Sequence, residues 1–140
     1  MVPVGADRRG FSRPRPPVKY VGTVSGRETA VSPQDLPRLL VERVNAGDLE
    51  GIIELYEMGA VLALPGGGIA VGRDAIRTFY GELLATRPTF MAGAQLPALE
   101  SGGLALTSTR LVGGGVTAEI ARRQPDGTWR WVVDRPDVLE

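Results

Sequence analysis

The stretch that constrains the fold most strongly is AEIARRQPDGTWRWVVD, residues 118–134. Apolar and polar side chains alternate on both sides of Gln124-Pro125-Asp126-Gly127. Pro-Asp-Gly between two alternating patterns is typical of a tight turn, so we predict an antiparallel hairpin. Centring the turn on Pro125-Asp126 pairs residue 121 with 130, 119 with 132 and 117 with 134.

This pairing divides the hairpin into two faces. One face carries Thr117, Glu119, Ala121, Arg123, Arg130, Val132 and Asp134, and the other carries Ala118, Ile120, Arg122, Trp129, Trp131 and Val133. Glu119, Arg130 and Asp134 then form a carboxylate–guanidinium–carboxylate group on one face. Such a group is either an ordinary ion network or a site that activates water.

Three helices are predicted upstream of the hairpin. The first begins at Ser32-Pro33-Gln34-Asp35, with Ser32 as the expected cap, and ends at Gly47. Asp48 is expected to cap a short second helix, and Gly72-Arg73-Asp74 leads into a third helix that Pro88 ends. Their apolar stripes are, in order, Leu36, Leu39, Leu40, Arg43 and Val44; Leu49, Ile52, Ile53 and Tyr56; and Ile76, Phe79, Tyr80, Leu83 and Leu84.

Strand patterns occupy much of the remaining chain. We predict strands over residues 60–64, 69–71, 90–99, 104–112, 116–123 and 128–134, with turns at the glycine clusters. The order of elements predicts an α+β domain over residues 32–140, with helices on one face of a curved antiparallel sheet.

Composition excludes several classes of function. The 140 residues contain no cysteine and no histidine, which excludes disulfides, thiol nucleophiles, Cys/His zinc sites and histidine triads. Sixteen basic residues balance sixteen acidic ones, which argues against nucleic-acid binding. The apolar runs are far shorter than the ~20 residues of a membrane span. We expect no metal and no cofactor.

Residues 1–31 read as a flexible basic leader. Residues 1–27 contain six basic residues and one acid, and Pro14, Pro16 and Pro17 favour extended backbone. Arg8-Arg9 is not followed by an apolar stretch, so we expect no export and a cytoplasmic protein. Two weak alternatives remain, a proline-recognition motif over residues 14–17 and an edge strand over residues 18–24.

Four segments carry a family resemblance. LVERVNAGD (40–48), LYEMGAVL (55–62), GRDAIRTFY (72–80) and the hairpin stretch resemble the ketosteroid-isomerase-like, or nuclear-transport-factor-2-like (NTF2-like), superfamily, and in particular its SnoaL-like branch. The resemblance covers about residues 33–137. It implies a cone-shaped curved sheet with the helices on its concave face, one apolar pocket and a homodimer. Members include isomerases, polyketide cyclases, dehydratases, epoxide hydrolases and non-catalytic association domains.

The resemblance also implies where catalytic residues would lie. The oxyanion tyrosine of the isomerases falls on Leu40, their general-base aspartate on Leu64 before Pro65, and their protonated aspartate on Glu119. Leucine can neither take a proton nor stabilise an enolate, so these residues argue against steroid-type isomerisation by that route. Epoxide hydrolases of this fold use two carboxylates bridged by an arginine, but Thr117 stands where their arginine would lie.

We therefore expect a small-molecule-binding protein with an apolar pocket, as an accessory cyclase-, isomerase- or hydrolase-type enzyme of bacterial secondary metabolism. The alternatives are a non-catalytic ligand-binding or dimerisation module, and an interaction domain whose basic leader docks a partner. The expected partners are a small apolar organic ligand and a second copy of the chain, without nucleic acid or membrane.

The expected site residues fall into three groups. Glu119, Asp134 and Arg130 are the candidate catalytic residues. The family pattern places Ile120, Trp129 and Trp131 at the dimer interface, although hydrophobicity alone would bury both tryptophans in the core. Simple packing of helix against sheet is the alternative role for the pocket aromatics. The candidate pocket residues are Leu40, Tyr56, Leu64, Phe79, Tyr80, Thr107, Thr109 and Val132.

Overall fold

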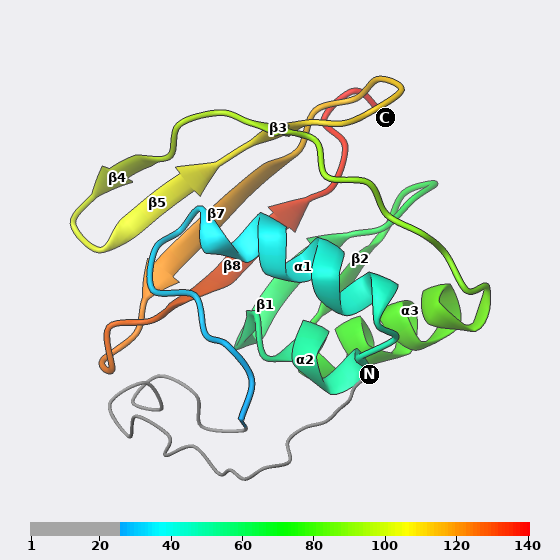
Figure 1. The fold of residues 1–140 in the computed structure, drawn as a ribbon, viewed down its shortest axis with the longest axis horizontal. Coiled ribbons are helices and arrows are strands. Elements are labelled where there is room, and N and C mark those ends of the chain that lie inside the picture. The colour runs from blue at the N-terminus through cyan, green and yellow to red at the C-terminus, as the bar shows by residue number, and fades with distance from the viewer. Residues whose placement is uncertain (1–25) are drawn as a thin grey trace, which may run out of the picture.

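The computed structural model describes residues 26–140 (Figure 1). Most of the predicted leader, with its proline motif and the alternative strand over residues 18–24, lies outside the described residues. The helices are α1 (Asp35–Asn45), α2 (Leu49–Ile53) and α3 (Arg73–Ala85). The strands are β1 (Tyr56–Ala63), β2 (Ile69–Val71), β3 (Ala94–Gln95), β4 (Leu99–Ser101), β5 (Leu104–Thr107), β6 (Thr109–Arg110), β7 (Ala118–Arg123) and β8 (Trp129–Arg135).

Six strands form one sheet in the order β2-β1-β8-β7-β5-β4, and β3 pairs with β6 in a small second sheet. All pairings are antiparallel except that of β1 with β8, which is parallel. The three helices lie on one face of the large sheet (Figure 1). The predicted α+β fold with a mostly antiparallel sheet is therefore confirmed. No helix among residues 26–140 has the length and hydropathy needed to cross a bilayer.

The first helix begins differently from the prediction. Its N-cap is Gln34, which makes no side-chain capping bond, so the cap predicted at Ser32 is wrong. The Asp35 carboxylate instead accepts hydrogen bonds from the backbone N–H groups of Val31 and Ser32, both at 3.1 Å. An acid in the first turn thus satisfies amides that precede the helix, and its charge also suits the positive end of the helix dipole.

The start of α2 fixes the segment that leads into the domain. The Asp48 carboxylate accepts from the Gly51 amide at 3.1 Å, which confirms the predicted cap. Arg27 donates to both oxygens of Asp48, at 2.7 and 2.9 Å, and to Glu54 at 2.9 Å. The Trp129 amide donates to the Ala30 carbonyl at 2.9 Å. The last residues of the predicted leader therefore pack against the domain.

The loop of the β7–β8 hairpin is one residue longer than predicted. The Gln124 amide donates to the Thr128 carbonyl at 2.7 Å, and Gly127 has a φ of 87°. Three residues therefore connect the strands, with a left-handed glycine at the end of the loop. Ala121 pairs with Trp131, so the predicted pairing of residues 121 and 130 is wrong.

A β-bulge then changes the register a second time. Beyond Ala121, Ile120 pairs with Val133, so Val132 is an extra residue of β8 that pairs with none. The next pair is Glu119 with Asp134, in place of the predicted pairs 119 with 132 and 117 with 134. The two shifts bring the tryptophans inward and keep Glu119 and Asp134 on the same face.

Both tryptophans belong to the core. Trp129 is 5% exposed and Trp131 is 1% exposed, and both pack in the main apolar cluster beneath the helices. Their predicted place on the outer surface at a dimer interface is therefore wrong. The longer loop explains the error, because a one-residue slip moves every side chain of a strand to the opposite face.

The predicted strand over residues 90–99 is mostly irregular. Only β3 and the first residue of β4 fall within it, and Pro97, which has no N–H to donate, separates the two strands. Gly93 lies so close to β6 that a Cβ atom would come within 2.2 Å of the Arg110 carbonyl oxygen. This close approach holds the irregular connection from α3 against the sheet.

Candidate functional site

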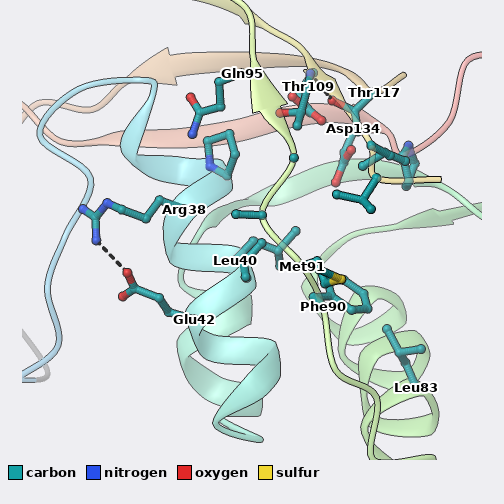
Figure 2. A pocket seen from close by; sticks show the side chains of 18 of the residues that line it. Arg38, Leu40, Glu42, Leu83, Phe90, Met91, Gln95, Thr109, Thr117 and Asp134 are labelled. Carbon is teal, nitrogen blue, oxygen red and sulfur yellow. Dashed lines mark hydrogen bonds and ion pairs between the residues drawn. The ribbon is translucent and has the colours of Figure 1, made fainter. Parts of the chain in front are cut away.

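A cavity of about 880 Å³ lies between α1, α3, the connection over residues 89–95 and the helix-covered face of the sheet. We call the helix-covered face of the six-stranded sheet the inner face. The volume lies within the range of small-molecule sites. Figure 2 shows Leu40 on the α1 side and Thr109, Thr117 and Asp134 on the sheet side. The apolar lining includes Leu40, Val41, Phe79, Leu83, Phe90, Met91, Leu111, Val112 and Trp131.

Two carboxyl groups form the polar end of this cavity. Glu119 of β7 and Asp134 of β8 are cross-strand partners, and both line the cavity. Glu119 is only 6% exposed and Asp134 only 3%. No arginine or lysine of the described residues forms a hydrogen bond or ion pair with either group, so their charges have no cationic partner.

Neutral hydroxyl groups support Asp134. The Tyr56 hydroxyl donates to Asp134 Oδ2 at 2.5 Å and lies 2.8 Å from the Tyr80 hydroxyl. Because Tyr56 has one hydroxyl proton, its bond to the carboxylate requires Tyr80 to donate to Tyr56. Burial raises the pKa of both tyrosines far above the ordinary value, so they remain neutral donors.

A second set of neutral groups supports Glu119. The Thr107 hydroxyl donates to Glu119 Oε1 at 2.6 Å, and Trp131 Nε1 donates to the same hydroxyl oxygen at 3.4 Å. The hydroxyl oxygen of Thr109, which also lines the cavity, is buried without a hydrogen-bond partner among the described residues. The polar end of the cavity therefore has, besides the carboxyls, a hydroxyl group that can still donate or accept a hydrogen bond.

Burial governs the protonation of this pair. It raises the pKa of Glu119, and the hydrogen bond from Thr107 only partly opposes the shift. Burial and the nearby Glu119 raise the pKa of Asp134 to about 7, against the opposing effect of the Tyr56 hydrogen bond. The negative charge of Glu119 disfavours ionisation of Asp134, so a proton can stay on Asp134 while Glu119 acts as a base.

The structure places the other predicted pocket residues in three ways. Leu40, Phe79, Tyr80 and Thr109 line the cavity. Tyr56 and Thr107 lie behind the two carboxyls as hydrogen-bond donors. Leu64 packs against the core without lining the cavity, and Val132 does not line it either, because the longer hairpin loop turns Trp131 inward and Val132 away.

Arg130 does not bridge the carboxyls, and this part of the prediction is wrong. It lines a separate small pocket together with Arg73, Asp126 and residues preceding α1. The cause is the longer hairpin loop, which turns Arg130 away from the inner face and puts Trp131 there. Without Arg130, the group resembles neither an ion network nor the arginine-bridged pair of the epoxide hydrolases.

Sequence reasoning missed several lining residues. Trp131 had a usable signal, since its hydrophobicity favoured the inner face. Phe90 and Met91 had none, because they lie in an irregular connection. The Asn45 side chain fixes this connection, since its amide group donates to the Phe90 carbonyl at 2.9 Å and accepts from the Phe90 amide at 2.6 Å.

No cluster suited to a metal ion occurs among the described residues, where no three His, Cys, Asp or Glu side chains converge. The charged groups of the cavity wall are instead Arg38 and Glu42 of α1 and the Glu119–Asp134 pair. What this arrangement can do is bind an apolar molecule and exchange a proton with its polar group.

Comparison with known proteins gives the fold class. No family model and no curated protein matches the sequence. Among solved structures, a ketosteroid isomerase-like protein from Erwinia carotovora atroseptica shares 20% identity at a TM-score of 0.60, covering 73% of this chain and 89% of that one. An NTF2-like protein with a cystatin-like fold from Novosphingobium aromaticivorans shares 26% identity at a TM-score of 0.53, covering 72% and 75%.

A third similar structure is named as an association domain. It is a candidate calcium/calmodulin-dependent protein kinase type II association domain from Thiobacillus denitrificans, with 13% identity and a TM-score of 0.66 over 78% of this chain and 96% of that one. The chain therefore has the NTF2-like, ketosteroid isomerase-like fold, as the sequence resemblance implies. The fold by itself assigns no activity.

Proposed function

We propose that the protein binds a small, largely apolar organic molecule in the cavity, with the polar group of the ligand at Glu119 and Asp134. One observation carries this proposal, the burial of two carboxyls at the end of an apolar cavity with only neutral donors around them. Burying such groups without a cation costs stability. Strongly perturbed carboxyls in a cleft are typical of functional sites.

The same pair supports acid–base chemistry on the ligand. One carboxyl can accept a proton while its partner donates one, as isomerase-, cyclase- and hydrolase-type reactions require. Glu42 is paired with Arg38, whereas Glu119 and Asp134 are buried without a cation, so they are the candidate proton-transfer groups of the cavity. We therefore propose an accessory enzyme that moves a proton on a bound organic substrate.

A thermal-shift screen of the full chain tests ligand binding. Steroids, aromatic polyketides, terpenoid epoxides and fatty acids represent different apolar bodies and head groups. A ligand at about 100 times its Kd adds ~2.7 kcal/mol of stability, or several degrees in Tm. Stabilisation by one chemical class supports the proposal, whereas no shift by any class, with the protein folded, contradicts it.

Matched variants then test the chemistry. For any compound class that is turned over, Glu119→Gln should abolish turnover while the fold persists. Glu100→Gln, the same change at an exposed position of β4, should leave turnover unchanged. Equal turnover by both variants would show that Glu119 is not a proton-transfer group, and binding of a compound class without turnover would reduce the proposal from an enzyme to a binding protein.

A second candidate function, a dimerisation module, rests on the opposite face of the sheet. Cross-strand pairing places six apolar side chains in one continuous row there, and we call them the outer row. Leu99 is 67% exposed and Val71 is 58% exposed. Contiguous exposed apolar surface of this kind marks interaction sites. The row consists of Val71, Val61, Val133, Ile120, Leu106 and Leu99.

We propose that this row joins two copies of the chain, with Ile120 in the contact. The name of the Thiobacillus denitrificans protein, an association domain, favours such a role for this fold. Sedimentation of the full chain tests it, since a dimer supports the interface and a monomer at high concentration contradicts it. A dimer is compatible with ligand binding in each cavity.

A further inference from the structure

We propose that the polar group of the ligand is a protonated amine, so that the end of the cavity is an ammonium site. This inference rests on the proposed function, because it names the chemical class that the same cavity takes. It follows from the charges, the acceptors and the aromatic surfaces around Glu119 and Asp134.

The charges of the cavity wall are unbalanced. Three carboxyls and one guanidinium line it, and the guanidinium belongs to Arg38. Arg38 is already engaged on α1, where it donates to Glu42 at 3.1 Å (Figure 2) and to Asp35 at 3.4 Å, and it also pairs with Glu28. Among the described residues, the cavity wall therefore has no free cation for Glu119 and Asp134.

The groups that face the pair from the packed elements do not supply a positive charge either. Tyr56 of β1 and Tyr80 of α3 are neutral, and Thr107 of β5 is a hydroxyl. A ligand cation would replace the missing partner, and its attraction to the pair would be strong because the surroundings are apolar.

Acceptor positions at this end of the cavity are unoccupied. Asp134 uses Oδ2 for Tyr56, and no hydrogen bond from the described residues occupies its Oδ1. The Thr109 hydroxyl oxygen also has no partner among these residues. An ammonium group brings three N–H donors and no acceptor, which suits such a set. A carboxylate ligand would add acceptors and negative charge where both are already in excess.

Aromatic rings also line the cavity. Trp131, Tyr80, Phe79 and Phe90 all line the cavity. The faces of aromatic rings attract cations, and aromatic walls with a nearby carboxylate are a common way to bind an ammonium group. The apolar remainder of the wall would hold the organic body of the amine.

Calorimetric titration of the full chain with head-group series tests the inference. Each series keeps one apolar body (naphthylethyl, adamantyl or dodecyl) and presents an amine, an alcohol or a carboxylate. Phosphate replaces Tris, which is itself an amine. At pH 8.0 we expect the amine to bind at least about tenfold tighter than the alcohol, and the carboxylate to bind more weakly than both.

The pH dependence gives an independent signature. Alkyl amines remain protonated from pH 5.5 to pH 8.0, whereas Asp134, whose pKa is raised to about 7, ionises within that range. Amine affinity should therefore rise by at least about tenfold over that range, with release of protons at pH 6.5. Alcohol affinity should stay level or fall, because an alcohol gains nothing from ionisation of the pair.

Variants separate this inference from the underlying function. Asp134→Asn should remove the preference for the amine while alcohol binding persists, and Glu100→Gln should preserve the preference. Alcohol binding as tight as amine binding in the wild type would overturn the amine class and leave the proposed function standing. No binding by any head group on any of the bodies would overturn both.

Discussion

The two faces of the six-stranded sheet depart from the usual distribution of side chains in opposite ways. The inner face buries Glu119 and Asp134, whereas the outer row aligns six aliphatic side chains across all six strands, of which four are exposed and two are half-buried. Carboxyls are seldom buried without a charged partner, and contiguous apolar surface is seldom left uncovered.

The comparison shows where binding of another molecule could lower the free energy of this protein. The inner face contains polar groups that a ligand could satisfy, and the outer face contains apolar area that a second protein surface could cover. The core between them, with Trp131 and Tyr56 packed at a ring-centroid distance of 5.4 Å, provides the stability that both departures require.

The largest expected effect is at Trp131. Its replacement by alanine should lower the free energy of unfolding by about 3–5 kcal/mol, because the side chain is fully buried and contacts Tyr56. The matched change on the outer face, Val133→Ala, should cost far less. Urea unfolding measures both. Equal losses would show that the outer row is as well covered as the core.

The next largest effect is a pH dependence of the free energy of unfolding, which burial of Asp134 on the inner face causes. Because the pKa of Asp134 is raised to about 7, its contribution to stability is present below the pKa of the unfolded chain and is lost as pH rises through 7. The loss should amount to a few kcal/mol. Asp134→Asn should therefore be more stable than the wild type at pH 8 and lack this part of the pH profile.

Urea unfolding at pH 5 and pH 8 measures this effect as a difference between wild type and variant, which cancels the titration of the other carboxyls. A wild type that gains stability relative to Asp134→Asn on going to pH 8 would contradict the burial of an uncompensated carboxyl.

A smaller effect is expected from the tyrosine pair. Tyr56→Phe removes the donor to Asp134 and leaves the Tyr80 hydroxyl without its partner, at a cost of about 1–3 kcal/mol. Loss of that donor should also raise the pKa of Asp134 further, which carboxyl-selective NMR titration would detect. Tyr80→Phe serves as the control, because it keeps the direct bond to Asp134. An unchanged pKa in Tyr56→Phe would mean that the bond contributes nothing to the charged form.

The smallest effect on stability is expected on the outer face. Val133→Lys changes a 45% exposed side chain, so the unfolding free energy of the monomer should change by less than about 0.5 kcal/mol. The same change should dissociate a dimer that forms through the outer row, and sedimentation velocity measures this. A dimer that survives the lysine would place the interface elsewhere.

The helices and the α+β order could be predicted because their signals are local. Asp48 caps α2 by accepting from the amide of Gly51, three residues further along the chain. The apolar stripe of α1 buries Leu36 and Leu39, as its spacing indicates. The register of the last hairpin could not be predicted, because Pro125-Asp126-Gly127 suits both a two-residue and a three-residue loop. The structure has the three-residue loop, and the extra residue turns Trp131 toward the inner face and Arg130 away from it.

The shared face of Glu119 and Asp134 was predicted correctly, but the alternation used to predict it is not the whole cause. The sequence placed Glu119 and Asp134 on one face by simple alternation, whereas the structure reaches that result through the longer loop and the compensating bulge at Val132. Such a bulge has no signature in these residues. The wall formed by Phe90 and Met91 was missed because irregular backbone has no period to detect.

The bulge decides which way Asp134 faces. In a regular strand, Val132 would pair with Ile120 and Val133 with Glu119, which would turn Asp134 toward the outer face. Because Val132 is the extra residue, deleting it would remove the bulge and leave Asp134 opposite Glu119. The polar end of the cavity therefore depends on an irregularity in the backbone of β8 as much as on the identity of its residues.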